Sequence, residues 1–176
     1  SRANSNKVFL LAEGNSNKRS GGLFVSNDSG ESWVKVSSYA ELTSRAWYYI
    51  EVFADPNDED TVYVLSARAF RSIDGGKTWN RIYSGHGDYH VLWINPDNSK
   101  NMIISDDGGG EITFDNGSTW SSINNMPTAQ FYRVNVDNLF PYNLYGGQQD
   151  NSTVKIASIG SRGGISERDW SASAGG

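Results

Sequence analysis

The chain has 176 residues, a formal net charge of −5 and no cysteine, which excludes disulfide bonds and thiolate metal sites. The acidic balance, with no Lys/Arg cluster beyond Lys18-Arg19, argues against a nucleic-acid surface. No apolar run approaches the about 20 residues that a membrane-spanning helix needs, whereas 12% aromatic residues and 19 glycines favour strands joined by tight turns.

Alternation and turn signals predict four consecutive strand groups, which we call blades. The first has strands at residues 8–12, 23–26 and 33–37, with a loop at 14–22 and no innermost strand. Residues 39–45 are the best helix candidate, but they are too short for a stable helix. The second blade has strands at residues 48–53, 62–66, 69–72 and 79–83.

The third and fourth blades follow the same plan. Strands of the third are predicted at residues 89–94, 102–105, 111–114 and 120–123, and strands of the fourth at residues 131–136, 144–147 and 153–158. Turns rich in Pro, Asn and Asp follow the first strand of each blade at residues 55–60, 95–100 and 137–143. The first of these is not an EF-hand loop, because Asp60 stands where that loop needs glycine.

One short pattern closes a hairpin in each of the first three blades. It reads hydroxyl-x-Asp-x-Gly-x-hydroxyl-Trp, and its copies occupy residues 26–33, 72–79 and 113–120. The aspartates Asp28, Asp74 and Asp115 are 46 and 41 residues apart, a period typical of β-propeller blades. The fourth blade lacks the pattern at residues 161–167.

The chemistry of the pattern is that of a tight turn. The carboxylate accepts hydrogen bonds from nearby backbone, the glycine supplies positive φ, and the tryptophan is expected to bury its ring against the blade. We therefore interpret these residues as structural: Asp28, Gly30, Trp33, Asp74, Gly76, Trp79, Asp115, Gly117 and Trp120. The pattern resembles the Asp-box, or bacterial neuraminidase (BNR) repeat, of β-propellers, which lies on the face away from the ligand site.

The predicted fold is all-β, a partial or open propeller of about four four-stranded antiparallel blades. A single segment covers residues 1–176, with blades near 1–38, 46–84, 88–124 and 130–170. Propellers usually close with about four to eight blades, and an open arc leaves exposed edges. We therefore expect a segment of a longer propeller, or one that closes with another copy.

Three segments carry possible chemistry on the opposite face. Both histidines flank an aspartate in His86-Gly-Asp88-Tyr-His90, and in an extended strand these side chains share one side. The group suits general acid/base work, a metal or a substrate contact, and it also fits an ordinary cluster where a loop joins a strand. Asp106 and Asp107 precede three glycines, and an amide-rich segment follows at residues 146–151. Ordinary turn chemistry explains both equally well.

The aromatic residues beside these segments are Trp47, Tyr48, Tyr89 and Tyr132. Aromatic faces near amides and carboxylates are typical of carbohydrate sites, although such residues also fill blade cores. The arginines Arg45, Arg68 and Arg133 could serve acidic ligands, and a sialidase would need three that converge. The sequons at Asn27, Asn116 and Asn151 are doubtful glycan acceptors, because the first two lie in the repeated turns.

A resemblance covers nearly the whole chain and is most specific at residues 85–151, in Gly87-Asp-Tyr-His90, Ser105-Asp-Asp-Gly-Gly109 and Tyr145-Gly-Gly-Gln-Gln-Asp-Asn151. These stretches are similar to propeller proteins related to sortilin and to xyloglucan-cleaving glycoside hydrolases. The resemblance implies a multi-bladed, exported protein that binds a carbohydrate or peptide at the mouth of its channel.

The sequence thus predicts a secreted segment, extracellular or periplasmic, that binds or processes polysaccharide with its loops. Catalysis would be glycoside hydrolysis, retaining or inverting, by two carboxylates. The candidates are Asp88, Asp107 and Asp150. Expected substrate contacts are His86, His90, Trp47, Tyr132, Gln148 and Gln149. The alternative is a non-catalytic, sortilin-like module that binds a peptide or protein. We expect no cofactor, no metal, no nucleic acid and no membrane span; the partners would be an oligosaccharide and further blades.

Overall fold

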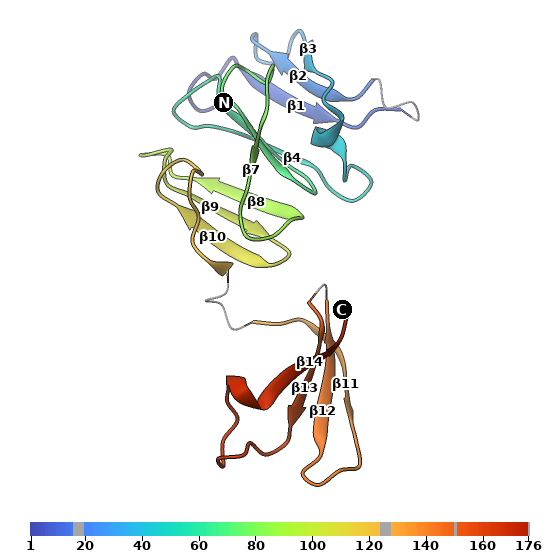
Figure 1. Cartoon of the computed structure of the whole chain (residues 1–176). Helices are drawn as coiled ribbons and strands as arrows, with labels where there is room; N and C mark the ends of the chain where they lie inside the picture. Colours follow the sequence, from blue (N-terminus) through green and yellow to red (C-terminus); the bar gives the residue numbers. More distant parts are fainter. Residues whose placement is uncertain (16–19, 124–127, 150, 176) are drawn as a thin grey trace. The chain divides into compact units, whose positions relative to one another are not determined.

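The computed structural model describes residues 1–15, 20–123, 128–149 and 151–175 (Figure 1). The chain divides into two compact units, Ser1–Met126 and Pro127–Gly176. Unit 1 contains three antiparallel sheets and unit 2 contains one, in the chain order predicted for the blades. The described residues include two short 3-10 turns, η1 (Ala40–Thr43) and η3 (Glu167–Asp169).

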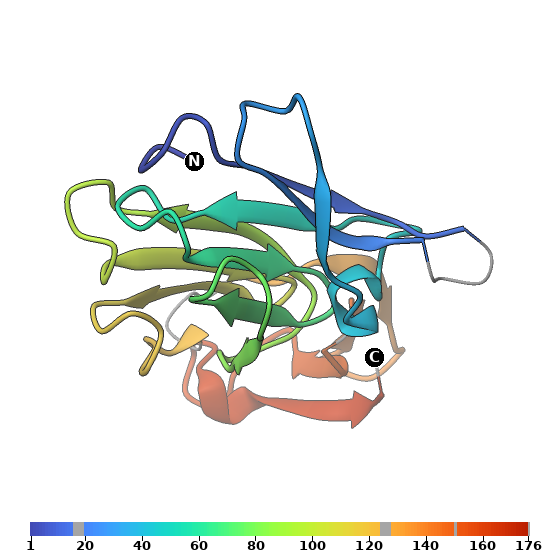
Figure 2. The ribbon, with the colours of Figure 1, turned by 90° about the horizontal axis from the view of Figure 1, so that it is seen from above.

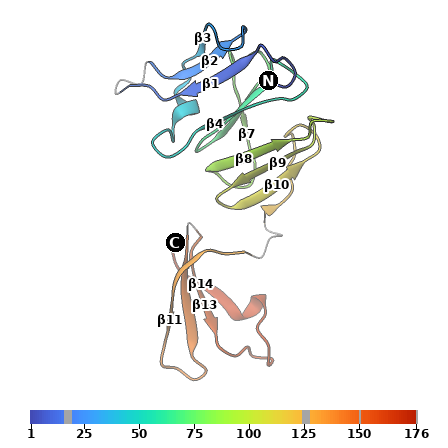
Figure 3. The same ribbon diagram turned by 180° about the vertical axis from the view of Figure 1, so that it is seen from behind.

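The three sheets of unit 1 follow one another in space (Figures 1 and 3). The first is β1 (Val8–Ala12), β2 (Gly22–Ser26) and β3 (Val34–Ser37). The second is β4 (Glu51–Ala54), β5 (Val62–Leu65), β6 (Ala69–Ser72) and β7 (Asn80–Ile82). The third is β8 (Tyr89–Ile94), β9 (Met102–Asp106) and β10 (Gly109–Thr113). Strand β1 contacts β4, and β4 contacts β8, so neighbouring sheets pack together.

Two hydrophobic clusters lie between the sheets of unit 1, and β5 contributes to both. Val62 and Val64 join a cluster with residues of the first sheet and η1, including Leu23 and Leu42. The alternate residues Tyr63 and Leu65 join a cluster with the third sheet. Because successive side chains of a strand point to opposite faces, β5 is buried on both faces, and all four of its residues are fully buried.

The repeated turns form as the pattern predicts; we call them the repeat turns. In the second one, Asp74 accepts hydrogen bonds from Ser72 Oγ (2.7 Å), Thr78 N (2.9 Å) and Thr78 Oγ1 (2.6 Å). The first and third repeat turns have the same arrangement around Asp28 and Asp115. Each glycine has positive φ, between 82° and 97°. The carboxylates are therefore structural links within a hairpin.

The tryptophans of the repeat turns differ in burial, which corrects one expectation. Trp79 packs into the cluster between the first and second sheets, and Trp120 into the cluster between the second and third. Trp33 remains 40% exposed, and its Nε1 donates to Gly30 O. Trp79 and Trp120 each pack on the sheet that precedes their own in the chain. Among the described residues, no such sheet precedes β1.

Unit 2 is one four-stranded antiparallel sheet. Its strands are β11 (Phe131–Val136), β12 (Asn143–Gln148), β13 (Thr153–Ala157) and β14 (Trp170–Ala174), in that order. The last strand was not predicted. It follows η3, where Asp169 accepts hydrogen bonds from Ser166 N (2.8 Å) and Ser166 Oγ (2.9 Å). Trp170, the first residue of β14, is therefore also preceded by a turn held by a carboxylate, although this turn differs from the repeat turns.

Two predicted strands need correction. Strand β4 begins at Glu51 rather than at residue 48, because Tyr48 N and Tyr49 N both donate to Arg45 O, at 2.8 and 2.7 Å, in a tight turn. Residues 120–123 are not a strand. Instead, Ser121 N donates to Ile112 O, and Ser121 Oγ accepts from Ile112 N at 3.0 Å.

Candidate functional site

Three segments of unit 1 meet where β4 and β8 begin: residues 44–49, 85–90 and 106–109. We call this place the loop site. The turn after η1 positions the first segment beside the beginnings of both strands (Figure 2). The second is fixed by Asp88 N and Tyr89 N, which donate to Ala67 O (3.1 Å) and Ser66 O (3.0 Å). The third is the hairpin between β9 and β10.

Asp88 forms an ion pair with Arg45. Arg45 Nη1 lies 2.8 Å from Asp88 Oδ1, and both side chains are 25% exposed. Asp88 has a φ of 58°, a value that few non-glycine residues adopt. The expectation that His86, Asp88 and His90 share one side of an extended strand is therefore wrong. Only His90 lies within β8, and His86 Nδ1 contacts the backbone carbonyl of Gly87 at 3.0 Å.

His90 is held by a carboxylate and a phenol ring. Its Nε2 lies 2.6 Å from Asp107 Oδ1. The ring of Tyr49 stacks on the imidazole, with centroids 4.4 Å apart and planes 27° from parallel. Tyr49 Oη donates to Ser66 O at 3.3 Å. Burial raises the pKa of Tyr49 far above its ordinary value, and the negative charge of Asp88 raises it further, so this phenol stays neutral.

Two exposed aromatic rings border these pairs. Trp47 is 74% exposed and Tyr48 is 63% exposed. Their ring centroids are 5.9 Å apart at 36°. The Arg45 guanidinium lies 5.2 Å from the Trp47 ring centroid and 5.5 Å from that of Tyr48. Because the guanidinium is fixed by Asp88, cation–π contacts hold both rings at the rim of the site.

Two buried carboxylates lie beneath the second segment. The two carboxylate oxygens of Glu111 both accept from Gly85 N, at 2.8 and 2.7 Å. Asp106 Oδ1 accepts from Gly108 N and Gly109 N, at 2.9 and 3.0 Å, while its Oδ2 is buried without a partner. Burial raises the pKa of Asp106, and Glu111 adds to the effect. These groups support the loops rather than facing a ligand.

The loop site gathers five of the predicted residues, namely Trp47, His86, Asp88, His90 and Asp107. It also contains Tyr49, which sequence reasoning missed because residues 48–53 read as one strand. Ser66 lies outside the three segments, but its carbonyl oxygen accepts from Tyr49 Oη and Tyr89 N. Tyr89 is 2% exposed and belongs to the core rather than to a ligand surface.

The remaining predicted residues belong to unit 2. There Tyr132 is 66% exposed, Gln148 Nε2 donates to Asn151 O at 2.9 Å, and Gln149 N donates to Gln130 O. Asp150 lies outside the described residues. A sialidase would need three free arginines, but two of the candidates are paired with carboxylates: Arg45 with Asp88 and Arg68 with Glu41. The third candidate, Arg133, belongs to unit 2.

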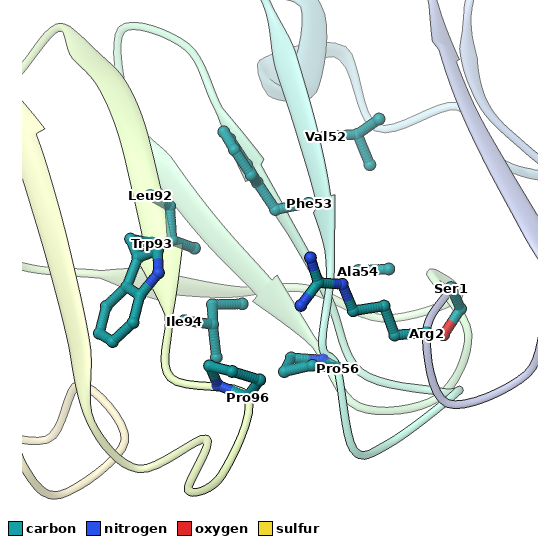
Figure 4. Close-up of a pocket in the computed structure, with 10 residues that line it drawn as sticks. All are labelled: Ser1, Arg2, Val52, Phe53, Ala54, Pro56, Leu92, Trp93, Ile94 and Pro96. Carbon is teal, nitrogen blue, oxygen red and sulfur yellow. The ribbon is translucent and has the colours of Figure 1, made fainter.

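A mostly apolar groove of about 560 Å³ lies further along the same two strands, and Ser1 and Arg2 also line it. Phe53 and Ala54 of β4 line one wall, and Trp93 and Ile94 of β8 line the other (Figure 4). Pro56 and Pro96 close the end remote from the loop site.

Within the described ranges, no helix has the length and apolar character needed to cross a membrane. No group of three or more His, Asp or Glu side chains in those ranges is arranged to hold a metal ion.

No family model matches the chain, and no curated protein matches it. Solved structures do resemble it. A GH74 enzyme of Niastella koreensis superposes with a TM-score of 0.54 at 17% identity, over 96% of this chain and 28% of that enzyme. An ancestral GH74 enzyme gives 0.53 at 16% identity, over 88% of this chain and 22% of the enzyme. YCF48 bound to D1 peptide gives 0.48 at 13% identity, over 89% of this chain and 49% of that one.

The chain thus spans about a quarter of the length of the two GH74 enzymes. At these identities the likeness concerns the fold. Together with the four antiparallel sheets, it shows that the chain is an all-β protein made of the blades of a partial β-propeller.

Proposed function

We propose that this chain is part of a secreted β-propeller, extracellular or periplasmic, that binds polysaccharide at the loop site. The observation that carries the proposal is the exposed pair Trp47 and Tyr48 beside Asp88, His90 and Asp107. Aromatic faces pack on the C–H faces of sugar rings, while carboxylates and imidazole exchange hydrogen bonds with hydroxyl groups. The GH74 neighbours support a carbohydrate-related role through the fold.

The charges of the loop site favour neutral glycans over acidic ones. The two arginines near it are each paired with a carboxylate, in Arg45–Asp88 and Arg68–Glu41. Asp107 adds negative charge that only a protonated His90 would balance. An acidic sugar would therefore meet no free cation among the described residues of the site, and like charges would repel it.

If the propeller also hydrolyses glycosides, we propose that it does so with two carboxylates. Asp88 and Asp107 are the candidates in unit 1, and Asp150, outside the described residues, is the third. Both described carboxylates already hold a partner, at 2.8 and 2.6 Å, which favours binding over catalysis by this segment alone.

A second candidate function is the binding of a peptide or protein in the manner of sortilin. The apolar groove between β4 and β8 favours it, because apolar walls along two edge strands suit an extended peptide. We further propose a relation to Asp-box propellers, and closure by further blades of the same propeller or by another copy. The exposure of Trp33, whose counterparts pack on a preceding sheet, supports that closure.

A glycan array tests the proposal. We expect the chain to bind neutral oligosaccharides more strongly than uronate- or sialate-containing ones. The variants Trp47→Ala and Asp88→Ala should weaken binding at least fivefold, whereas Phe114→Ala, an exposed aromatic in the third repeat turn, should leave it unchanged. Binding to no glycan, or equal binding by all four proteins, would refute the carbohydrate role. Saturable binding of an apolar peptide library instead would favour the second candidate.

A further inference from the structure

We propose that His90 receives the ligand through its Nδ1 atom, as an acceptor for a hydroxyl hydrogen, and that Tyr49 is the residue that positions it. The inference rests on the proposed function for the identity of the ligand. The tautomer that it requires can be measured without any ligand.

The contact with Asp107 fixes the tautomer of His90. An ionised carboxylate can only accept, so Nε2, 2.6 Å from Asp107 Oδ1, must carry the hydrogen. In the neutral ring the other nitrogen is then an acceptor. His90 Nδ1 has no hydrogen-bond partner among the residues that the structure describes, and the side chain is 37% exposed. A bare acceptor on a partly exposed ring is therefore offered to solvent or ligand.

His86 has the opposite arrangement. Its Nδ1 lies 3.0 Å from the carbonyl oxygen of Gly87, and a carbonyl also only accepts. His86 must therefore carry its hydrogen on Nδ1. The chain has only these two histidines, and its structure assigns them opposite tautomers. Each one is an internal control for the other.

Tyr49 holds the His90 ring in this orientation. Its stacking at 4.4 Å restricts rotation of the imidazole, and its own ring is fixed by the hydrogen bond to Ser66 O. The Arg45 guanidinium lies 5.8 Å from the Tyr49 ring centroid. The Tyr49 ring is thus close to both Arg45, which pairs with Asp88, and His90, which pairs with Asp107. Tyr48 meets the imidazole edge-on, at 6.5 Å.

The arrangement predicts how ligand binding depends on pH. The charged or titratable groups that contact His90 are Asp107, Tyr48 and Tyr49, and the Arg45–Asp88 pair lies next to Tyr49. When the imidazole is protonated, both nitrogens donate and Nδ1 can no longer accept. Ligand binding through this acceptor should therefore need the neutral imidazole and weaken in acid.

The first experiment is a long-range ¹H–¹⁵N correlation spectrum of the uniformly labelled chain, without ligand, at alkaline pH where imidazole is neutral. We expect one histidine protonated on Nε2 and the other on Nδ1, and His86→Gln assigns the signals. In Asp107→Ala the His90 signals should match the mixture of both neutral tautomers that an unrestrained imidazole adopts. Tyr49→Leu should shift the His90 signals part of the way toward that mixture. A His90 ring protonated on Nδ1 in the native chain would overturn the inference.

The second experiment measures binding of maltohexaose and cellohexaose by calorimetry. The amide of His90→Gln still reaches Asp107, because it replaces Nε2, but it has no acceptor at the place of Nδ1. We expect roughly fivefold weaker binding, the effect of one hydrogen bond, with Tyr49→Leu weaker than Tyr49→Phe because the latter keeps a stacking ring. Unchanged affinity in His90→Gln would refute the acceptor role.

The two experiments separate the two claims. If the spectrum shows the assigned tautomers but neither hexasaccharide binds, the ligand role of His90 and the proposed function for such glycans are both contradicted. The tautomer assigned from the His90–Asp107 contact would still be supported. Binding that depends on Trp47 but not on His90 would support the proposed function and refute this inference.

Discussion

The carboxylate of each repeat turn links the two sides of a hairpin through hydrogen bonds. Asp28 accepts from the hydroxyl two residues before it and from both the amide and the hydroxyl four residues after it. These bonds favour the ionised form, with Ser26 giving the largest effect, and lower the pKa of Asp28 from 3.8 to about 2. The Thr119 hydroxyl is the main cause of the same shift in Asp115, and the Thr78 hydroxyl lowers the pKa of Asp74.

These shifts predict how stability depends on pH. A carboxylate whose pKa is lower in the folded chain stabilises that chain fully above its unfolded pKa, and this contribution is lost as pH falls through the folded value. The contribution of Asp28 and Asp115 should therefore be complete above pH 3.8 and disappear toward pH 2. Urea unfolding midpoints measured from pH 7 to pH 2 should fall in that window. The decline should be shallower in Asp115→Asn but unchanged in Asp97→Asn, an exposed turn residue.

Gly76 and Gly30 occupy equivalent positions with φ of 90° and 97°, yet their surroundings differ. A Cβ at position 76 would lie 2.2 Å from Leu23 Cδ2, whereas one at position 30 would meet only Trp33 Cζ2, at 3.7 Å. Alanine at position 30 should cost about 1–2 kcal/mol of unfolding free energy from backbone strain alone. At position 76 overpacking should add about 1–3 kcal/mol. Equal losses in chemical denaturation would show that Leu23 moves aside.

The tryptophans of the second and third repeat turns, Trp79 and Trp120, each join their own sheet to the sheet before it. Trp79 Nε1 donates to Ser37 Oγ, at the end of β3, across the boundary between the first two sheets (3.2 Å). The ring packs with residues from both of them. Trp79, which directly precedes β7, is therefore a contact between the two sheets.

Replacing Trp79 and Trp33 should have different effects on stability, because Trp79 packs between two sheets and Trp33 is partly exposed. Trp79→Ala should lower the unfolding free energy by about 3 kcal/mol, within the range for large-to-small changes in a core. Trp33→Ala should cost less than about 1 kcal/mol, because the Trp33 ring is 40% exposed and truncating it removes less buried area. Guanidinium unfolding of both variants checks the difference. A comparable loss in Trp33→Ala would mean that the exposed ring has a partner, and would support closure by another copy.

The elements show what local sequence can and cannot determine. The strands and repeat turns were predictable because alternation and the Asp-x-Gly spacing are local signals. The turn at residues 44–49 was not, because its aromatic run, Trp47 to Tyr49, has the composition of a strand while its amides bond to Arg45 O. The same error concealed Tyr49. The pairing of His90 with Asp107 joins a residue of β8 to one in the hairpin between β9 and β10, and no sequence spacing reveals which of several nearby carboxylates a histidine contacts.

The third sheet of unit 1 carries a row of exposed apolar side chains on the face opposite its core. Register places Trp93 opposite Ile103, and Ile103 opposite Ile112, across β8, β9 and β10. Their exposed fractions are 49%, 44% and 42%. Contiguous exposed apolar surface usually marks an interaction site or an aggregation hazard.

We expect the isolated chain to self-associate through this row. The double variant Ile103→Thr, Ile112→Thr keeps β-branched residues, which suit strands, and should reduce the apparent mass at high concentration while leaving the urea midpoint nearly unchanged. Sedimentation velocity at concentrations from about 10 to about 200 µM provides the measurement, because exposed hydrophobic surface drives association in roughly this range. Concentration-independent sedimentation of the native chain would contradict the expectation.

Strand β5 has neighbours on both faces, whereas each outer sheet of unit 1 has a core on one face only. Repeat architectures lose structure from their ends, since each repeat is stabilised by its neighbours. Amide protons of Val62–Leu65 should consequently exchange with deuterium last, and those of β3 and β10 should exchange earlier through partial opening. The loop site contains residues from both regions: Tyr49 precedes the most protected sheet, whereas His90 lies in the first strand of the next one. Fraying of the third sheet would therefore dismantle the His90–Asp107 pair while the aromatic rim stayed folded, so ligand affinity could fall well before global unfolding begins.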